Sequence, residues 1–234
     1  MCGRYAFFTP LEAVARLFGA TEIHVPDPAP RYNIAPTQEV PVVRISPQLE
    51  AGDGTVREIA LARWGLVPFW AKDPAIGNRM INARAESVAG KPAFRAAFRR
   101  RRCLLPADGF FEWQSTDSGK QPWYIHHAEG APLALAGLWE LWDRDEDAPP
   151  LATCTIITSR ANSFMERLHH RMPVVLDAPA RDAWLDPASP PELLQGLLEP
   201  AEDAPLAAHP VSRKVNSPFN ESAELLDPVR ISGA

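Results

Sequence analysis

The second residue of the chain is a cysteine that can become a double nucleophile. Met1 is normally removed when a small residue follows it, so Cys2 would become an N-terminus with its amine free beside its thiol. These groups titrate near pH 8 and pH 8.5, at about the values of free amines and thiols. An aldehyde can condense with the amine to a Schiff base, and the thiol can then close a five-membered thiazolidine. The alternative is that Cys2 only starts a strand.

Two further segments place polar side chains in apolar surroundings. In residues 80–86, strand alternation puts Asn82, Arg84 and Glu86 on one face, a set that suits phosphate or sugar, although Arg84 and Glu86 can also form a structural pair. Glu112 lies among aromatic residues, where partial burial would raise its pKa and suit it to proton transfer. Its alternative place is the solvated face of an alternating strand.

Residues 168–173 combine two histidines with an arginine. His169 and His170 are adjacent and point differently in regular structure, which makes them poor joint metal ligands. One catalytic histidine beside an anion-binding Arg171 is the better functional interpretation. Trp64 and Trp70 flank a short apolar run, and each is either a core residue or a surface on which bases stack.

Composition predicts one globular protein without a membrane segment. The 234 residues are 46% hydrophobic and 23% charged, which excludes wholesale disorder. No apolar run approaches the ~20 residues that cross a bilayer, and the first residues do not resemble a signal peptide, so we expect a cytoplasmic protein. The net charge is −5, yet residues 78–102 hold eight basic residues and one acid, which indicates an anion-facing surface or the solvated end of a helix.

The cysteine pattern excludes a disulfide framework and a zinc site. The chain has three cysteines and no CxxC pair, and Cys103 and Cys154 lie in apolar runs that predict core positions. We expect neither a metal nor a cofactor.

The expected elements are short and separated by Gly, Pro, Asp and Ser. Helices are expected over 10–18, opened by a Thr9 capping box, over 91–101, and after N-caps at Asp177 and Ser189. Strands are expected over 40–45, 56–62, 110–114, 123–126, 133–141, 153–159 and 173–176. The pattern predicts an α+β fold: a mixed, mainly antiparallel, barrel-like β core flanked by short helices. One domain covers residues 1–234, with a peripheral tail from about 217 and a surface loop over 143–150.

Seven segments occur in a family-specific order: MCGRY, RYNIAP, WGLVPFW, INARAE, FFEW, LHHRMP and HPVSRKVN. From Cys2 to about Asn216 the chain resembles the SRAP (SOS-response-associated peptidase) family of abasic-site processing proteins. The resemblance implies a protein that binds single-stranded DNA as a monomer. Its Cys2, once Met1 is removed, would close a thiazolidine with the ring-opened sugar of an abasic site and leave a covalent protein–DNA crosslink.

The resemblance also implies roles for the matching residues. Asn82 would hold the N-terminus and the sugar, Glu112 would move protons, and His169 would assist opening of the deoxyribose ring. DNA contacts are implied for Arg4, Trp70, Arg84, Lys91 and Arg171, with the tryptophan as a stacking wedge and the arginines as phosphate ligands. Two departures matter: His170 stands where some relatives have Asp, and Lys91, where a relative has arginine, cannot offer a bidentate fork.

Other functions stay open at the level of sequence. Cys2, Glu112 and His169 can also cleave the Met1–Cys2 bond autocatalytically. Class II glutamine amidotransferases mature to an N-terminal cysteine followed by glycine, as in this chain, but normally continue into a synthase domain. A non-enzymatic module that binds single-stranded DNA would use only the basic stretch and the tryptophans.

Overall fold

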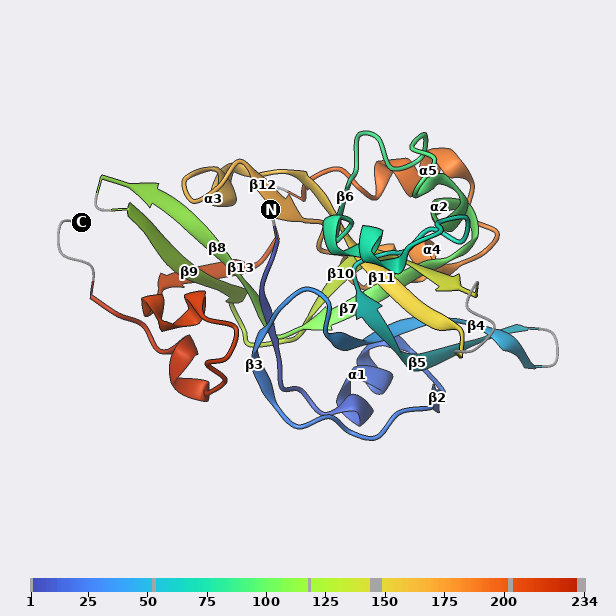
Figure 1. The fold of residues 1–234 in the computed structure, drawn as a ribbon, viewed down its shortest axis with the longest axis horizontal. Helices are drawn as coiled ribbons and strands as arrows, with labels where there is room; N and C mark the ends of the chain where they lie inside the picture. The colour runs from blue at the N-terminus through green and yellow to red at the C-terminus, as the bar shows by residue number, and fades with distance from the viewer. Residues whose placement is uncertain (1, 52–53, 118, 144–148, 202–203, 231–234) are drawn as a thin grey trace.

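The computed structural model describes residues 2–51, 54–117, 119–143, 149–201 and 204–230, which form two β-sheets with short helices around them (Figure 1). The first sheet has the strand order β13-β9-β8-β1-β3. Its strands are β1 (Tyr5–Phe7), β3 (Arg31–Ile34), β8 (Gly109–Thr116), β9 (Gly119–His127) and β13 (Leu206–Pro210). Every pairing in this sheet is antiparallel.

The second sheet follows the order β12-β11-β10-β7-β4-β5-β2, with β6 on β11. Its strands are β2 (Glu22–Ile23), β4 (Glu39–Ala51), β5 (Gly54–Trp64), β6 (Asn82–Arg84), β7 (Arg102–Ala107), β10 (Leu133–Trp142), β11 (Leu151–Arg160) and β12 (Arg171–Pro173). A parallel pairing of β11 with β5 joins the two ends of the path β5-β4-β7-β10-β11. The sheet therefore closes into a barrel, and the predicted α+β, mainly antiparallel, barrel-like core is confirmed.

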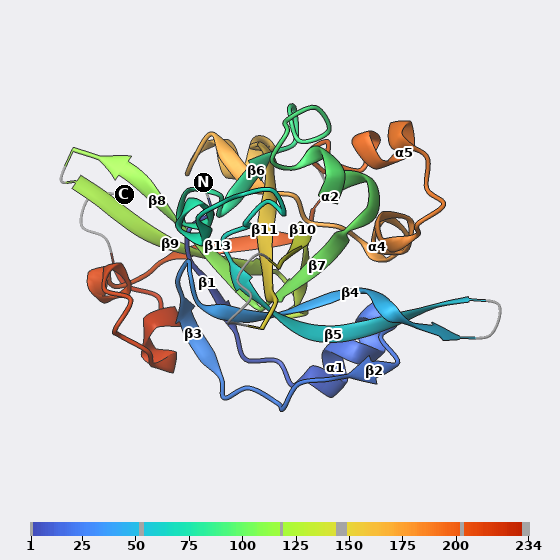
Figure 2. The same cartoon turned by 45° about the vertical axis from the view of Figure 1, so that its right-hand side comes forward.

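Short helices surround this core, and the elements are α1 (Leu11–Phe18), η1 (Pro74–Arg79), α2 (Arg95–Arg100), α3 (Ser163–Glu166), α4 (Ala178–Leu185), α5 (Pro191–Gly196), η2 (Arg213–Asn216) and η3 (Ala223–Leu226). Figure 2 shows α2 and α4 on one side of the molecule and the β8–β9 hairpin on the other, with the start of β1 between the hairpin and β6. Within the described ranges, no helix has both the length and the apolar character needed to cross a membrane.

The first sheet buries both of its faces. Tyr5 and Phe110 belong to the large core that it shares with the barrel, whereas their neighbours Ala6 and Phe111 pack on the opposite face with Val215. This is the alternation that a pleated strand imposes. Glu112 follows Phe110 by two residues and therefore shares its face, and only 2% of Glu112 is exposed. Its predicted alternative, a position on a solvated face, is wrong.

Helix positions agree better with the sequence than helix caps do. The helix over 10–18 is present as α1, but Pro10 is its N-cap, because the Thr9 hydroxyl donates to Asp108 instead. Asp177 caps α4 as predicted by accepting from the Ala180 amide at 2.9 Å. Ser189 is not a cap, because its hydroxyl donates to the Ala183 carbonyl and α5 begins after Pro190.

Proline accounts for two displaced boundaries. The helix expected over 91–101 is shortened to α2, since Lys91 precedes Pro92 and a residue before proline disfavours helical backbone. The strand expected over 173–176 lies earlier, as β12, and ends at Pro173. Beyond β12, Val175 forms an isolated antiparallel bridge to Leu135 of the barrel.

The C-terminal segment makes specific contacts with the first sheet. Pro228 bridges to Val211, Leu225 is buried, and the Ser217 and Asn220 carbonyls accept from Asn33. Met1 and most of the loop expected over 143–150 lie outside the described residues.

We expect Gly109→Ala to lower the free energy of unfolding by about 1–3 kcal/mol, the usual cost of overpacking. A Cβ at Gly109 would lie 2.4 Å from the Tyr124 ring and 2.6 Å from the Ile125 carbonyl oxygen. Urea denaturation measures the change. Gly196→Ala is the control, because nothing lies within 4 Å of a Cβ there. Equal stability of the two variants would show that the β8–β9 contact adjusts freely.

Candidate active site around Cys2

The carbonyl of Cys2 is held by a side chain from a strand far away in sequence. The Asn82 amide nitrogen donates to the Cys2 carbonyl oxygen at 2.8 Å. Asn82 itself is fixed by the parallel pairing of β6 with β11, in which it lies opposite Ile156. Cys2 is fully buried and belongs to the main core. The first two predicted catalytic residues therefore meet in the structure.

Glu112 reaches the same place through the pairing of β1 with β8. The Phe111 amide donates to the Arg4 carbonyl at 2.9 Å, and the strands run antiparallel from that bond. Cys2 and Glu112 therefore both lie beyond this bond, at the same end of the strand pair. Burial raises the pKa of the Cys2 thiol, and the negative charge of Glu112 raises it further. The thiol therefore stays protonated beside a buried carboxyl group.

His169 is held by the backbone of Arg171 in either protonation state. Its Nδ1 lies 3.0 Å from the Arg171 amide nitrogen and 3.1 Å from the Arg171 carbonyl oxygen. An unprotonated Nδ1 accepts from the amide, whereas an Nδ1 that carries a proton donates to the carbonyl, whether the ring is neutral or charged. The Arg171 backbone therefore orients the ring through Nδ1, and a proton transfer to or from a substrate would use Nε2.

His170 links this segment electrostatically to Glu112. Its ring lies 4.3 Å from the ring of His169, centroid to centroid. The positive charge of His169 is the main cause that lowers the pKa of exposed His170, and the charge of Glu112 acts in the opposite direction. Glu112 therefore acts electrostatically on both Cys2 and His170.

The two predicted arginines of this region differ in their partners. Arg171 forms a two-pronged ion pair with Glu86 and also donates to the Thr158 carbonyl. Arg84 lies opposite Thr158 on β6, with its side chain exposed and without a bonding partner in the described part of the chain. Glu86 is beyond the end of β6, so the expected common strand face of Asn82, Arg84 and Glu86 stops at Arg84.

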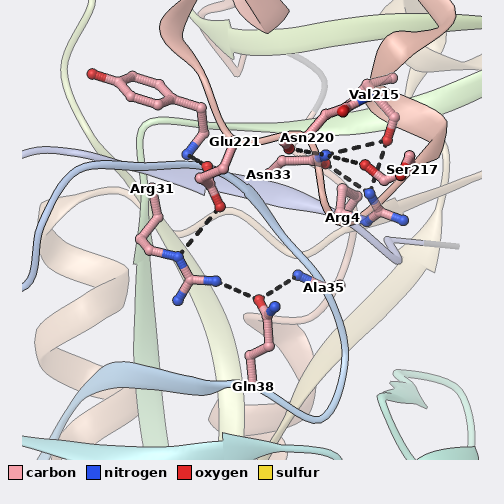
Figure 3. A network of polar contacts seen from close by, with 10 residues as sticks. Arg4, Arg31, Asn33, Ala35, Gln38, Val215, Ser217, Asn220 and Glu221 are labelled. Atoms are coloured by element: carbon pink, nitrogen blue, oxygen red, sulfur yellow. Dashed lines mark hydrogen bonds and ion pairs between the residues drawn. The ribbon is translucent and has the colours of Figure 1, made fainter.

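Arg4 is anchored in a polar network between the first sheet and the C-terminal segment (Figure 3). One of its terminal nitrogens donates to the Asn33 side-chain oxygen at 2.7 Å and to the Val215 carbonyl at 2.8 Å. The Asn33 amide nitrogen donates in turn to the carbonyls of Ser217 and Asn220, at 2.9 and 2.8 Å. The network fixes Arg4 two residues from Cys2.

Trp70 and Lys91 lie on separate exposed segments. Trp64 is a core residue whose indole donates to the Ile81 carbonyl at 2.9 Å, whereas Trp70 is 40% exposed. The turn that carries Trp70 is held by the Trp142 indole, which donates to the Ala71 carbonyl at 2.8 Å. Lys91 is exposed just before α2, and no contact in the described structure joins it to Cys2.

Two residues of this region were missed by the sequence analysis as site candidates. Asn33 is fully buried, and its signal was an asparagine inside a strand, where that residue type is disfavoured. His170 was treated only as a departure from the family pattern. Within the described residues, no group of three or more histidine, cysteine or acidic side chains is arranged to hold a metal ion.

Comparison with known proteins decides the family. The model of the family described as SOS response associated peptidase (SRAP) matches residues 1–218. The chain belongs to the SRAP family.

SRAP relatives cover nearly the whole chain. The abasic site processing protein YoaM of Bacillus subtilis is 42% identical over 230 residues, which are 97% of this chain and 98% of YoaM. The abasic site processing protein HMCES of Gallus gallus is 35% identical over 86% of this chain and 67% of its own length. A crystal structure of a Bacteroides thetaiotaomicron protein superposes with a TM-score of 0.84 at 24% identity, covering 98% of this chain and all of that one.

We expect Glu112→Gln to lower the pKa of the Cys2 thiol, because the substitution removes a negative charge that raises it. Alkylation of Cys2 at a fixed mildly alkaline pH should then be faster, as measured by peptide mass spectrometry. Cys103 and Cys154 are controls in the same chain, because burial is the main cause that raises the pKa of each and Glu112 does not contribute. An unchanged rate at Cys2 would contradict the electrostatic contact.

Proposed function

We propose that the protein captures abasic sites in single-stranded DNA as a covalent thiazolidine with Cys2, exposed as the N-terminal residue after removal of Met1. The relatives named abasic site processing proteins support the substrate. The observation that carries the chemistry is the meeting of Asn82 and Glu112 at Cys2: an amide holds its carbonyl at 2.8 Å while a buried carboxylate acts on its thiol.

The proposed reaction balances with the loss of one water. The Cys2 amine attacks the aldehyde carbon of the ring-opened sugar, and Glu112 as the acid protonates the hydroxyl group that leaves as water. The resulting carbon–nitrogen double bond accepts the sulfur, while the thiol proton passes to the Glu112 carboxylate and the nitrogen keeps its hydrogen. A protonated thiol beside a carboxylate, the arrangement favoured by the raised pKa of Cys2, is the state required for this ring closure.

His169 supplies the earlier step in this proposal. An abasic deoxyribose is mostly a closed hemiacetal, so a proton must be moved before the aldehyde is free. Because the Arg171 backbone bonds Nδ1 of His169 and so orients the ring, Nε2 is the ring nitrogen that can exchange a proton with the sugar. We assign it the ring-opening proton transfer.

Cations and one tryptophan provide the DNA contacts in this proposal. Arg84 is exposed and without an ion pair in the described part of the chain, which leaves it available for a phosphate. Arg171 must exchange Glu86 for a phosphate or share it. Exposed Trp70 can stack on a base. Arg4 contacts the DNA strand while it stays in its hydrogen-bond network, and Lys91 binds a phosphate at the edge of the DNA-binding surface.

The same groups can release Met1. With Glu112 as proton carrier, the Cys2 thiol can attack the carbonyl that precedes it, so that the acyl group passes from nitrogen to sulfur and the amine is freed. Water then hydrolyses the thioester, which releases methionine and restores the thiol. We propose this self-cleavage as the origin of the reactive N-terminus and expect the processed chain to act as a monomer.

We expect Cys2→Ala to abolish heat- and detergent-stable complexes with an abasic oligonucleotide. Cys2→Ser keeps the amine but lacks the sulfur, so it should form a Schiff base that borohydride traps and that is otherwise reversible. Denaturing gels with and without borohydride measure both variants, and an oligonucleotide without a lesion is the control.

Stable adducts of Cys2→Ala would assign the reaction to another nucleophile. A Cys2→Ser variant that borohydride fails to trap would contradict attack by the amine. If boiling in detergent always releases the DNA from the wild-type protein, the result would instead indicate a module that binds single-stranded DNA without a covalent bond.

We expect Glu86→Gln to tighten binding of single-stranded DNA, because it releases Arg171 from its ion pair while the bond to the Thr158 carbonyl remains. The logarithmic salt dependence of binding should steepen by about one unit, the change expected for one additional phosphate contact. Fluorescence anisotropy over a salt series measures this, with Arg84→Ala as the opposite control. Weaker binding of Glu86→Gln would show that Glu86 positions Arg171 for the phosphate.

A further inference from the structure

An open groove lies on the α2 and α4 side of the molecule, away from the β8–β9 hairpin (Figure 2). Its volume is about 780 Å³, and its lining comes from β4, the turn before Trp70, α2, β10 and the end of α4. None of the residues assigned to the Cys2 site lines it. The groove is therefore a surface that the proposed DNA reaction leaves unused.

The floor and one wall of the groove are apolar. Ile45 and Trp139 form part of the floor, and Leu141 and Leu185 line it from β10 and α4. Leu141, one residue before the end of β10, is 44% exposed. Such a lining favours an occupant with an apolar side chain of its own, since burying this surface is worth about 25 cal/mol per Å².

The opposite wall is a row of arginines at the C-terminal end of α2. Arg99 and Arg100 are exposed and form no ion pair in the described ranges, whereas Arg101 is neutralised by Glu140 at 2.7 Å. Glu140 is the only acid in the lining of this groove as described. The wall therefore keeps two uncompensated positive charges on a chain whose net charge is −5.

Arg102 fixes the direction of this wall. Its buried guanidinium donates to the Phe98 and Arg99 carbonyls at 3.0 and 2.7 Å, and to the Trp184 carbonyl at 2.6 Å. These bonds cap the last turn of α2 and tie it to α4. The backbone of the wall is therefore fixed, so that on binding a partner mainly the exposed Arg99 and Arg100 side chains lose conformational freedom.

We propose that this groove binds an acidic peptide segment of a partner protein, with a large apolar residue seated between β10 and α4 and its carboxylates against Arg99 and Arg100. A nucleic-acid track would instead use cations with aromatic faces for stacking bases. The lining does hold one exposed aromatic ring, that of Phe69, but Trp139 is only 6% exposed. The Glu140 carboxylate would repel a phosphate chain, and the aliphatic Ile45, Leu141 and Leu185 suit an apolar side chain of a peptide. This inference does not depend on the reaction at Cys2.

The test uses a fluorescein-labelled synthetic peptide in which aspartates flank a Leu-Phe pair. Anisotropy should show saturable binding to the full chain, and the double substitution Arg99→Glu and Arg100→Glu should weaken it roughly tenfold or more, because like charges then face each other. Leu141→Ser should also weaken peptide binding, because it removes an apolar side chain from the lining of the groove. All three side chains are exposed, so these variants keep the fold, and circular dichroism checks this. The matched control peptide replaces Leu-Phe by Ala-Ala.

Three outcomes would overturn the proposal. They are the absence of saturable binding of the peptide, equal binding of the peptide to wild type and variants, and displacement of the peptide by a lesion-free oligonucleotide that shows the same dependence on Arg99 and Arg100. The last outcome would assign the groove to DNA. Crosslinking of a short abasic oligonucleotide is expected to be unchanged in every variant, which separates this test from that of the proposed function.

Discussion

The pairing of β1 with β8 is the constraint on which the site depends. Backbone bonds from the Phe111 amide to the Arg4 carbonyl and from the Asp108 amide to the Ala6 carbonyl set the two antiparallel strands side by side. Cys2, which precedes β1, and the Glu112 carboxyl group, which β8 carries, then lie beyond the Phe111–Arg4 bond at the same end of the strand pair. Strand alternation turns Glu112 toward the buried face, where Cys2 also lies. A charged group beside a nucleophile thus results from sheet geometry.

Two further elements hold this pair from opposite sides. Asn82, carried on β6 by its pairing with the barrel strand β11, binds the Cys2 carbonyl. On the other side, Asn33 connects Arg4 to the C-terminal segment through a network of buried hydrogen bonds (Figure 3). Buried polar groups of this kind are costly when they lose a partner. The network therefore favours one position of the N-terminal strand over the alternatives.

Sequence patterns predicted the elements better than their connections. Capping and helix-stop residues located α1, and runs of β-branched and aromatic residues located the strands β4, β5 and β8 to β11, but the caps at Thr9 and Ser189 failed because those hydroxyls find tertiary partners. The short strands β1 and β3 have too few residues for a periodic signal and exist through their neighbours, and the alternation expected over 80–86 is limited to the three residues of β6. The candidates Cys2, Asn82 and Glu112 came from residue type and family motif. Their meeting depends on long-range pairing that no local pattern contains.

The central claim is that the amine and the sulfur of one processed residue capture the sugar aldehyde together. Intact-mass spectrometry followed by peptide mapping, after mixing with an excess of abasic oligonucleotide, tests it most directly. We predict one oligonucleotide per chain, a chain that lacks Met1, and a mass equal to the two components less one water, with the adduct on the peptide that begins at Cys2. An adduct on a chain that retains Met1, or on an internal residue, would contradict the account.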